Sequence, residues 1–309
     1  MKRFVLVLIC IGLGVILVLD SAGVAAAVTK SVQLCLNTII PSLFAFLVLS
    51  TFVTSSGLVN SDAAIFIISM AGGYPVGAKL LSDRVTKNPN YRKRAESMLM
   101  YCYCGSPVFL VALSSLGIQI WMSNVLACLT FAIFSNVKNF KKGQKMNTAI
   151  NCSSTVFINS VTSASTALYK ICTMIILFGI ITRGLTYFGI TDPLFHSLVE
   201  ITNTVNLQSN PAVIAALTST GGVCIIFQVS AICGGKLNLC KFLMARIPIA
   251  ILSGGICRLI TGNTVIETIA GSSKSAVSSG GNIIASVCLI MMTLILIKTE
   301  HRENNAPNQ

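Results

Sequence analysis

Long apolar stretches separated by short polar intervals run along most of this chain. Eight of them approach the roughly 20 residues that a helix needs to cross a bilayer. These are 4–19, 31–58, 95–116, 119–137, 163–188, 211–234, 238–261 and 281–298. Two more, 63–81 and 194–208, are too short or too polar to span and are better explained as re-entrant or buried segments. The pattern predicts an all-α polytopic membrane protein with about eight transmembrane helices and two re-entrant segments.

The first stretch admits two interpretations. Lys2 and Arg3 precede it, and small residues follow between Ala22 and Ala27, which is also the layout of a signal peptide. We favour a retained, signal-anchor-like first transmembrane helix within residues 1–30, because many further spans follow it.

The stretches occur in the same order in two parts of the chain. Residues 31–137 and 163–261 each contain a span, a short segment, an interrupted span and a final span. Because the first part enters the membrane from outside and the second from inside, the sequence predicts two inverted repeats. Residues 138–162 are then a basic and polar cytoplasmic linker, and 262–309 are a loop, the last transmembrane helix and a polar tail. Inverted repeats with interrupted helices are typical of transporters, which bind their solute at the interruptions.

The composition narrows the class of protein further. Hydrophobic residues make up 54% of the 309 residues and charged residues only 10%, against about a quarter charged in soluble domains. The mean hydropathy is +0.81. A single core of this size cannot hide so many apolar side chains, which disfavours a soluble enzyme, a secreted disulfide scaffold and a disordered chain.

The net charge of +13 lies mainly in the polar intervals. With both termini in the cytoplasm, most of the 22 basic residues fall on the inner side, as the positive-inside rule requires. The inner set comprises Lys2, Arg3, Lys79, the basic residues of 84–94 and 138–145, Lys236, Lys241, Arg246, Lys298 and Arg302. No groove-reading element or stacking aromatic residues accompany these runs, so we expect no nucleic-acid partner.

The 12 cysteines and two histidines do not follow the spacing of a metal site. Most of the cysteines lie inside apolar stretches and no CxxC pair occurs, whereas zinc needs four converging ligands. Thiols that pack as small hydrophobic side chains explain them. A P-loop and the common hydrolase motifs are absent as well, so we predict no enzyme, no metal and no cofactor.

The run Gly72–Lys79 (GGYPVGAK) is the sharpest signal for a solute site. Its glycines and proline cannot sustain a helix, and the freed backbone groups need protein, water or a solute as partner. A helix that restarts after Pro75 would point its amides at an anion. The candidate substrate-binding residues of this run are Gly72, Gly73, Tyr74, Pro75, Gly77 and Lys79. The alternative is a tight turn without a ligand.

A second interruption, at Gly105-Ser106-Pro107, makes Ser106 a further candidate, although a proline kink would also explain it. Glu200 and Asn203 lie in one of the short segments. A carboxyl group at membrane depth usually has a functional reason, here proton or sodium coupling. The alternative is that Glu200 lies at the outer interface and is solvated.

The remaining candidates lie in the interrupted span 211–234. They are Ser219, Thr220, Gly221 and, two turns later, Gln228. Their hydroxyl, backbone and amide groups are suited to bind a polar solute, and small residues here are equally suited to close helix packing.

These residues also carry a resemblance to a known family. The chain resembles the sporulation integral membrane protein family (YlbJ-like), whose members carry two nucleoside-recognition or Gate domains. The matching features lie within about residues 31–261 and are Pro41-Ser-Leu-Phe44 with Phe46, Gly73–Lys79 with Ser82-Asp83, Tyr101-Cys102 with Pro107-Val-Phe109, and Glu200-Ile-Thr-Asn203. The resemblance implies two Gate-like repeats, a fold like that of concentrative nucleoside transporters, and a role in endospore-forming bacteria. It also implies transport of dipicolinate towards the forespore, in the cell membrane or forespore membrane.

Our first functional hypothesis is therefore a membrane transporter or facilitator of a small polar, anionic solute. A nucleoside transporter and a non-transporting scaffold or assembly factor of sporulation are the alternatives. The expected partners are the solute, the lipid bilayer and a coupling proton or sodium ion.

Overall fold

The computed structural model of the chain describes residues 11–12, 14–58, 61–136, 152–207 and 209–262. Regular structure in these residues is helical, and they contain no β-strand. The predicted last transmembrane helix (281–298), the basic run 138–147 and half of the first predicted helix (4–19) lie outside the described residues.

Within each of the two parts of the chain, the helices follow one another with short connections. In the first part they are α2 (Ser21–Leu34), the π-helical turn η1 (Cys35–Ile39), α3 (Ile40–Ser55), α4 (Asp62–Gly72), α5 (Tyr74–Lys87), the 3₁₀ turn η2 (Pro89–Tyr91), α6 (Arg92–Leu99), α7 (Pro107–Leu113) and α8 (Gly117–Asn136). In the second part they are α9 (Ser154–Tyr187), α10 (Pro193–Val199), the 3₁₀ helix η3 (Ile201–Asn206), α11 (Pro211–Thr220), α12 (Gly222–Cys233) and α13 (Cys240–Thr261).

Five helical stretches of the described chain are long and apolar enough to cross a membrane. They are Ser21–Ser55, Gly117–Ser135, Ser154–Tyr187, Pro211–Cys233 and Cys240–Thr261. Each coincides with one of the eight predicted spans, which indicates an all-helical integral membrane protein. The helix α9 starts at Ser154, so the last part of the expected linker is helical.

The predicted span 95–116 differs from expectation. It consists of α6 and α7 with residues 100–106 non-helical between them, a longer interruption than Gly105–Pro107 alone. A proline keeps the preceding residue out of the α-region, and Ser106 is accordingly extended, with φ −67° and ψ 150°. The helix can therefore restart only at Pro107.

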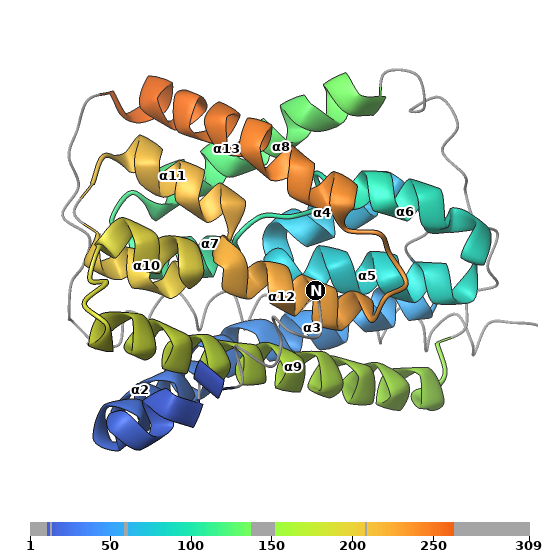
Figure 1. Cartoon of the computed structure of the whole chain (residues 1–309). Coiled ribbons are helices and arrows are strands. Elements are labelled where there is room, and N and C mark those ends of the chain that lie inside the picture. Colours follow the sequence, from blue (N-terminus) through green and yellow to red (C-terminus); the bar gives the residue numbers. More distant parts are fainter. Residues whose placement is uncertain (1–10, 13, 59–60, 137–151, 208, 263–309) are drawn as a thin grey trace, which may run out of the picture.

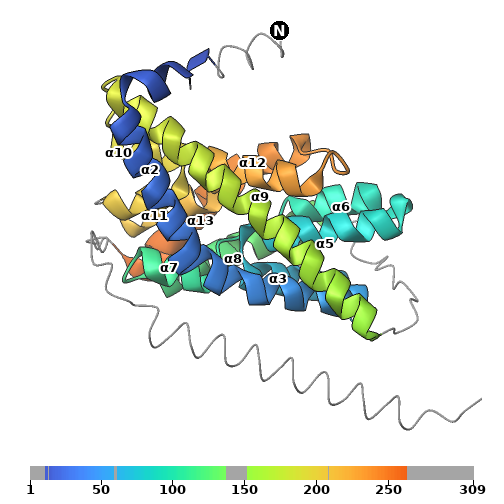
Figure 2. The ribbon, with the colours of Figure 1, turned by 90° about the horizontal axis from the view of Figure 1, so that it is seen from below.

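The long helices enclose the short ones. On one side α9 lies against α2 and α3, and on the opposite side α13 lies against α8 and α11 (Figure 1). Seen from below, α9 crosses the run of α2 and α3 obliquely (Figure 2). The shorter helices lie between these two sides, with α5 packed against α12. Helix ends are therefore brought into the interior.

A polar residue followed by proline starts several of the short helices. Ser106 accepts a hydrogen bond from the Phe109 amide (3.2 Å), and Asn210 accepts one from the Ala212 amide (2.9 Å). Asp192 caps α10 in the same way. Each cap satisfies an amide that has no partner within the helix, and a proline in the first turn leaves no amide to satisfy. Local sequence thus fixes where α7, α10 and α11 begin.

Ion pairs anchor the end of the α4–α5 pair. Asp62, in the first turn of α4, binds Arg84 of α5 (Nη1–Oδ1 3.2 Å) and Arg94 of α6 (Nε–Oδ2 2.5 Å). It also accepts a hydrogen bond from the Tyr91 hydroxyl. Burial, together with the Asp62 carboxylate, raises the pKa of Tyr91, so this hydroxyl stays a protonated donor.

Candidate functional site

Four interruptions of helices meet in the interior of the molecule. They are Gly73, residues 100–106, Glu200 and Gly221. The predicted interruptions within 72–77 and 219–222 are confirmed as helix ends. The first of them is confined to Gly73, however, because Tyr74 to Lys79 already belong to α5.

Gly73 joins α4 to α5 through a conformation that favours glycine. Its φ is 93°, and the position of a Cβ atom there would be 3.2 Å from Ser106 Cβ. A side chain would be strained and would press on the start of α7. Glycine at 73 therefore allows the first two interruptions to touch.

Gly221 and Gly222 make the corresponding close approach in the second part. Their φ angles are 79° and 71°. The Tyr103 hydroxyl occupies the space that a side chain on Gly221 would need, and a Cβ on Gly222 would be 3.0 Å from the Leu198 carbonyl oxygen. The interruption at Gly221 thus contacts both residues 100–106 and the end of α10.

Two tyrosines hold the interruptions together. Tyr74 donates its hydroxyl to the Thr218 carbonyl (2.6 Å), and Tyr103 donates to the Thr220 carbonyl (3.1 Å). These carbonyls belong to the last turn of α11, where helix carbonyls lack partners of their own. The two rings pack with their centroids 4.9 Å apart.

A cavity of about 600 Å³, its open mouth included, lies between these helix ends. The start of α5 contributes Gly73, Tyr74 and Pro75. The polar lining is completed by Thr38, Ser42, Ser106, Glu200, Thr202 and Gln228. The apolar lining includes Leu43, Phe109, Ile171, Ile175, Ile201 and Ile225. A largely apolar cavity with a few converging polar groups is typical of a small-molecule site.

Glu200 is the carboxyl group of this lining. Its side chain is buried, with the residue 5% exposed, and its carboxylate accepts hydrogen bonds from the Thr202 amide (3.2 Å) and the Thr202 hydroxyl. Glu200 forms no ion pair within the described part of the chain. The burial of the side chain contradicts the alternative in which Glu200 is solvated.

Gln228 lies on the same lining and is 4% exposed. The hydrogen bond that the structure gives its side chain runs from Nε2 to Cys224 Sγ, at 3.3 Å. A thiol sulfur is a weak acceptor. The amide therefore retains strong donor and acceptor capacity on the wall of the cavity.

The π-helical turn η1 brings α3 to the cavity. The Ile40 amide donates to the Cys35 carbonyl, five residues back, directly before Pro41. Proline cannot donate to the carbonyl four residues before it, so the hydrogen-bond ladder shifts register here. Thr38 and Ser42, on either side of this shift, both line the cavity.

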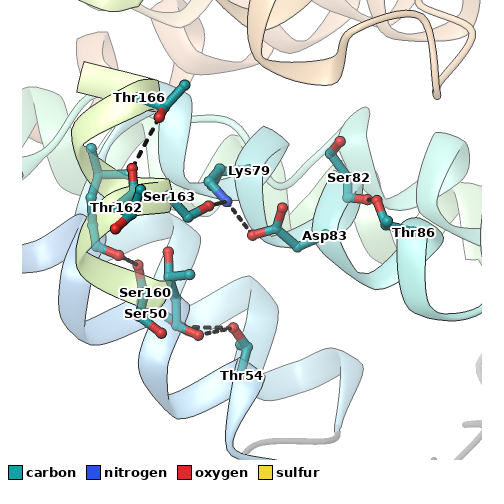
Figure 3. Close-up of polar contacts among 12 residues, drawn as sticks. Ser50, Thr54, Lys79, Ser82, Asp83, Thr86, Ser160, Thr162, Ser163 and Thr166 are labelled. Atoms are coloured by element: carbon teal, nitrogen blue, oxygen red, sulfur yellow. Dashed lines mark hydrogen bonds and ion pairs between the residues drawn. The ribbon is translucent and has the colours of Figure 1, made fainter. Parts of the chain in front are cut away.

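Lys79 does not line the cavity. Its ammonium group pairs with Asp83 of the same helix and donates to Ser163 Oγ of α9 at 2.6 Å (Figure 3). Hydroxyl groups from three helices surround this contact, among them Ser50 of α3 and Ser160 of α9. The structure thus places Lys79 in a contact between helices.

The other predicted site residues lie behind the lining. Gly72 packs on Phe46, and Gly77 packs on the backbone of Cys102. Asn203 donates to the Glu200 carbonyl at 3.2 Å. Ser219, Thr220 and Gly221 form the end of α11 beside Tyr103. These residues shape the interruptions without facing the cavity.

Arg246 is a residue whose placement the sequence analysis missed. The sequence placed it only among the basic residues of the inner side, whereas it is 3% exposed and lies inside α13, so its burial was not predicted. A charged residue within the apolar stretch 238–261 was itself a signal of a buried role.

Among the described residues, no three side chains of histidine, cysteine, aspartate or glutamate lie close enough to hold a metal ion. Comparisons with family models, with curated protein sequences and with solved structures find no match to this chain. The site is therefore interpreted from its own geometry.

Proposed function

We propose that this chain is a secondary transporter or facilitator of a small polar, anionic solute in a bacterial membrane. The observation that carries the proposal is the cavity lined at once by the start of α5, by Ser106, by Glu200 and by Gln228. Unsatisfied backbone is tolerated at membrane depth where it lines a cavity, and transporters bind solutes at interrupted helices. The packing of α3 on α9 and of α8 on α13 is also what two inverted repeats would produce.

An anion finds partial positive charge at the start of α5. The first amides of this 14-residue helix lack helical acceptors, and its dipole favours negative charge at Gly73–Pro75. Glu200 faces the same cavity, and two carboxylates in one cavity repel each other. Binding of an anion therefore favours the protonated form of Glu200, which makes a proton the coupling ion of choice.

The resemblance to the sporulation family points to dipicolinate as the solute and to a function in sporulation. A small aromatic dianion suits a cavity that is lined both by apolar side chains, among them Phe109, Ile171 and Ile175, and by the start of α5. We propose this solute as the first one to test.

A nucleoside is the second candidate, and one observation favours it. The lining combines a carboxyl, an amide and several hydroxyl groups, and no lysine or arginine is among the described residues that form it. Such a set can hydrogen-bond the hydroxyl and base groups of an uncharged solute.

Uptake into proteoliposomes that contain the purified full-length chain tests the proposal. Radiolabelled dipicolinate and uridine are offered separately, with and without an inward proton gradient. We expect saturable uptake of dipicolinate, reduced at least tenfold by Gln228→Ala and abolished by Gly73→Val, whose side chain would press on Ser106. Asn203→Ala is the matched control, because Asn203 lies behind the lining.

Each other outcome assigns a different function. Uptake of uridine alone would identify a nucleoside transporter. Solute binding without flux, or flux that none of these changes alters, would contradict the proposal and favour a membrane scaffold.

A further inference from the structure

Arg246 is a buried cation without an acidic partner. The ion pairs of the described residues all involve other basic side chains. Its Nη1 atom is buried and has no hydrogen-bond partner. Transfer of a guanidinium from water to such a place is costly unless a charge or dipole compensates it. Its retention inside a membrane helix indicates a use for the charge.

Four contacts hold the guanidinium in one position, and one of them runs from Nε to the Phe242 carbonyl oxygen at 3.4 Å. Nη2 donates to the Met100 carbonyl, next to the end of α6, where the helix dipole is negative. The group also lies over the rings of Tyr103 and Phe242, with Cζ at 4.4 Å and 4.7 Å from their centroids. The position of the charge is thus fixed, and Nη1 remains without a hydrogen-bond acceptor among the described residues.

The stacked tyrosines connect this charge to the cavity. Tyr103 packs on Tyr74, and Tyr74 lines the cavity. Both hydroxyls are already donated to carbonyls of α11, so the rings are held in place. Two aromatic rings therefore separate the guanidinium from a bound solute, in surroundings that screen charge poorly.

We propose that Arg246 determines the charge specificity of the cavity: its fixed positive charge, acting across Tyr103 and Tyr74, favours anionic solutes. The proposal rests on the transport function proposed above. Among the described residues of the lining, Glu200 is the acid and there is no lysine or arginine, although Lys30 acts on the Glu200 carboxylate from outside the lining. Arg246 adds a positive charge behind the Tyr74 side of the cavity wall. At about 10 Å and an effective dielectric constant of about 20, one charge changes the affinity for an anion by roughly tenfold.

Binding to the purified full-length chain tests this inference. The probes are small aromatic and aliphatic dicarboxylates, each paired with its uncharged diamide, and the readout is the ratio of the two affinities. We expect Arg246→Gln to lower this ratio at least about tenfold through loss of dicarboxylate affinity, because each of the two carboxylates loses an attraction of that size. Arg246→Lys keeps the charge and retains most of the preference. Arg258→Gln, on an exposed position of the same helix, leaves the ratio unchanged.

A second variant covers the case in which Arg246→Gln does not fold. Cys128 lies beside the guanidinium and donates to the Tyr103 carbonyl at 3.4 Å. Cys128→Asp would give Arg246 a carboxylate partner and cancel its field without removing the stacking. We expect the same loss of dicarboxylate preference, whereas a merely structural Arg246 would be stabilised with no change in the ratio.

The possible results separate the two proposals. An unchanged ratio in Arg246→Gln and in Cys128→Asp overturns the role of Arg246 and leaves transport intact. Equal affinity of the unaltered protein for dicarboxylates and diamides would also overturn the role of Arg246 and leave the transport proposal intact. Failure of every probe to bind, together with the absence of uptake into proteoliposomes, overturns the proposed function as well.

Discussion

Asp62 and Glu200 are both acids at the start of short segments, and their surroundings are opposite. Asp62 is neutralised by Arg84 and Arg94 and receives the Tyr91 hydroxyl. Glu200 forms no ion pair within the described residues; the amide and hydroxyl of Thr202 and the Asn203 amide hold its carboxylate, and it faces a cavity. An acid that is neutralised by neighbouring bases fixes the fold. An acid without such neighbours leaves its charge to be balanced by a proton or a solute.

The largest expected effect is that of Glu200 on the pH dependence of the affinity for dicarboxylates. Protonation of Glu200 removes the repulsion of a bound anion, so affinity for dicarboxylates rises as the pH falls, by at most about tenfold per pH unit for one proton. In Glu200→Gln the slope is lost and affinity stays near its low-pH value. Isothermal titration between pH 5 and pH 8 measures both. Glu96→Gln, which removes a carboxylate paired with Arg92 on α6, is the control. An unaltered slope in Glu200→Gln contradicts the assignment.

The next effect concerns stability at the neutralised acid. Asp62→Asn leaves two arginines without their carboxylate and should lower the free energy of unfolding by about 2–3 kcal/mol, somewhat less than for fully buried pairs. Solute affinity should stay within about twofold, because Asp62 does not line the cavity. Denaturant unfolding in detergent gives the first quantity. Asp192→Asn, which preserves an exposed helix cap, should change little. A large loss of affinity at full stability would reverse the roles given to the two acids.

A smaller expected effect, on stability, tests the close packing of Gly221 against Tyr103. Gly221→Ala and Gly235→Ala both place alanine at positive φ, 79° and 76°. A Cβ on Gly221 meets the Tyr103 hydroxyl, whereas a Cβ on Gly235 meets nothing within 4 Å. Both changes carry backbone strain, and Gly221→Ala should cost about 1–2 kcal/mol more from overlap. Equal melting temperatures of the two variants would show that the contact with Tyr103 is loose.

The smallest effect is expected at Lys79. Lys79→Met removes an ion pair whose acid, Asp83, has a side chain that is 28% exposed and can be hydrated. The loss of stability should be about 1 kcal/mol or less, and dicarboxylate affinity should not change, in contrast to Arg246→Gln. Thermal unfolding and the same titration check this. A tenfold loss of dicarboxylate affinity in Lys79→Met would show that Lys79 acts as a counter-charge for the bound anion.

Local sequence was sufficient to predict where the helices are interrupted. It was not sufficient to predict which distant residues contact the interruptions. Gly73, Gly221 and the Ser106-Pro107 and Asn210-Pro211 pairs act through backbone geometry, which neighbours along the chain determine. The contact of Lys79 with Ser163, and that of Tyr74 with Thr218, join residues far apart in sequence. No period or motif contains this information. Lys79 was therefore predicted at the site, and the burial of Arg246 was not predicted, because a single sequence does not show which helices pack together.

The length of α9 has a consequence for its position in the lipid. Its 34 residues extend about 51 Å, while the hydrocarbon layer is only about 30 Å thick. Even an inclination of about 40°, near the upper end for membrane helices, leaves roughly 39 Å along the normal. The ends of α9 must then reach the headgroup layers on both sides. A bilayer of another thickness would therefore change the inclination of α9 or the number of its turns that lie among the headgroups.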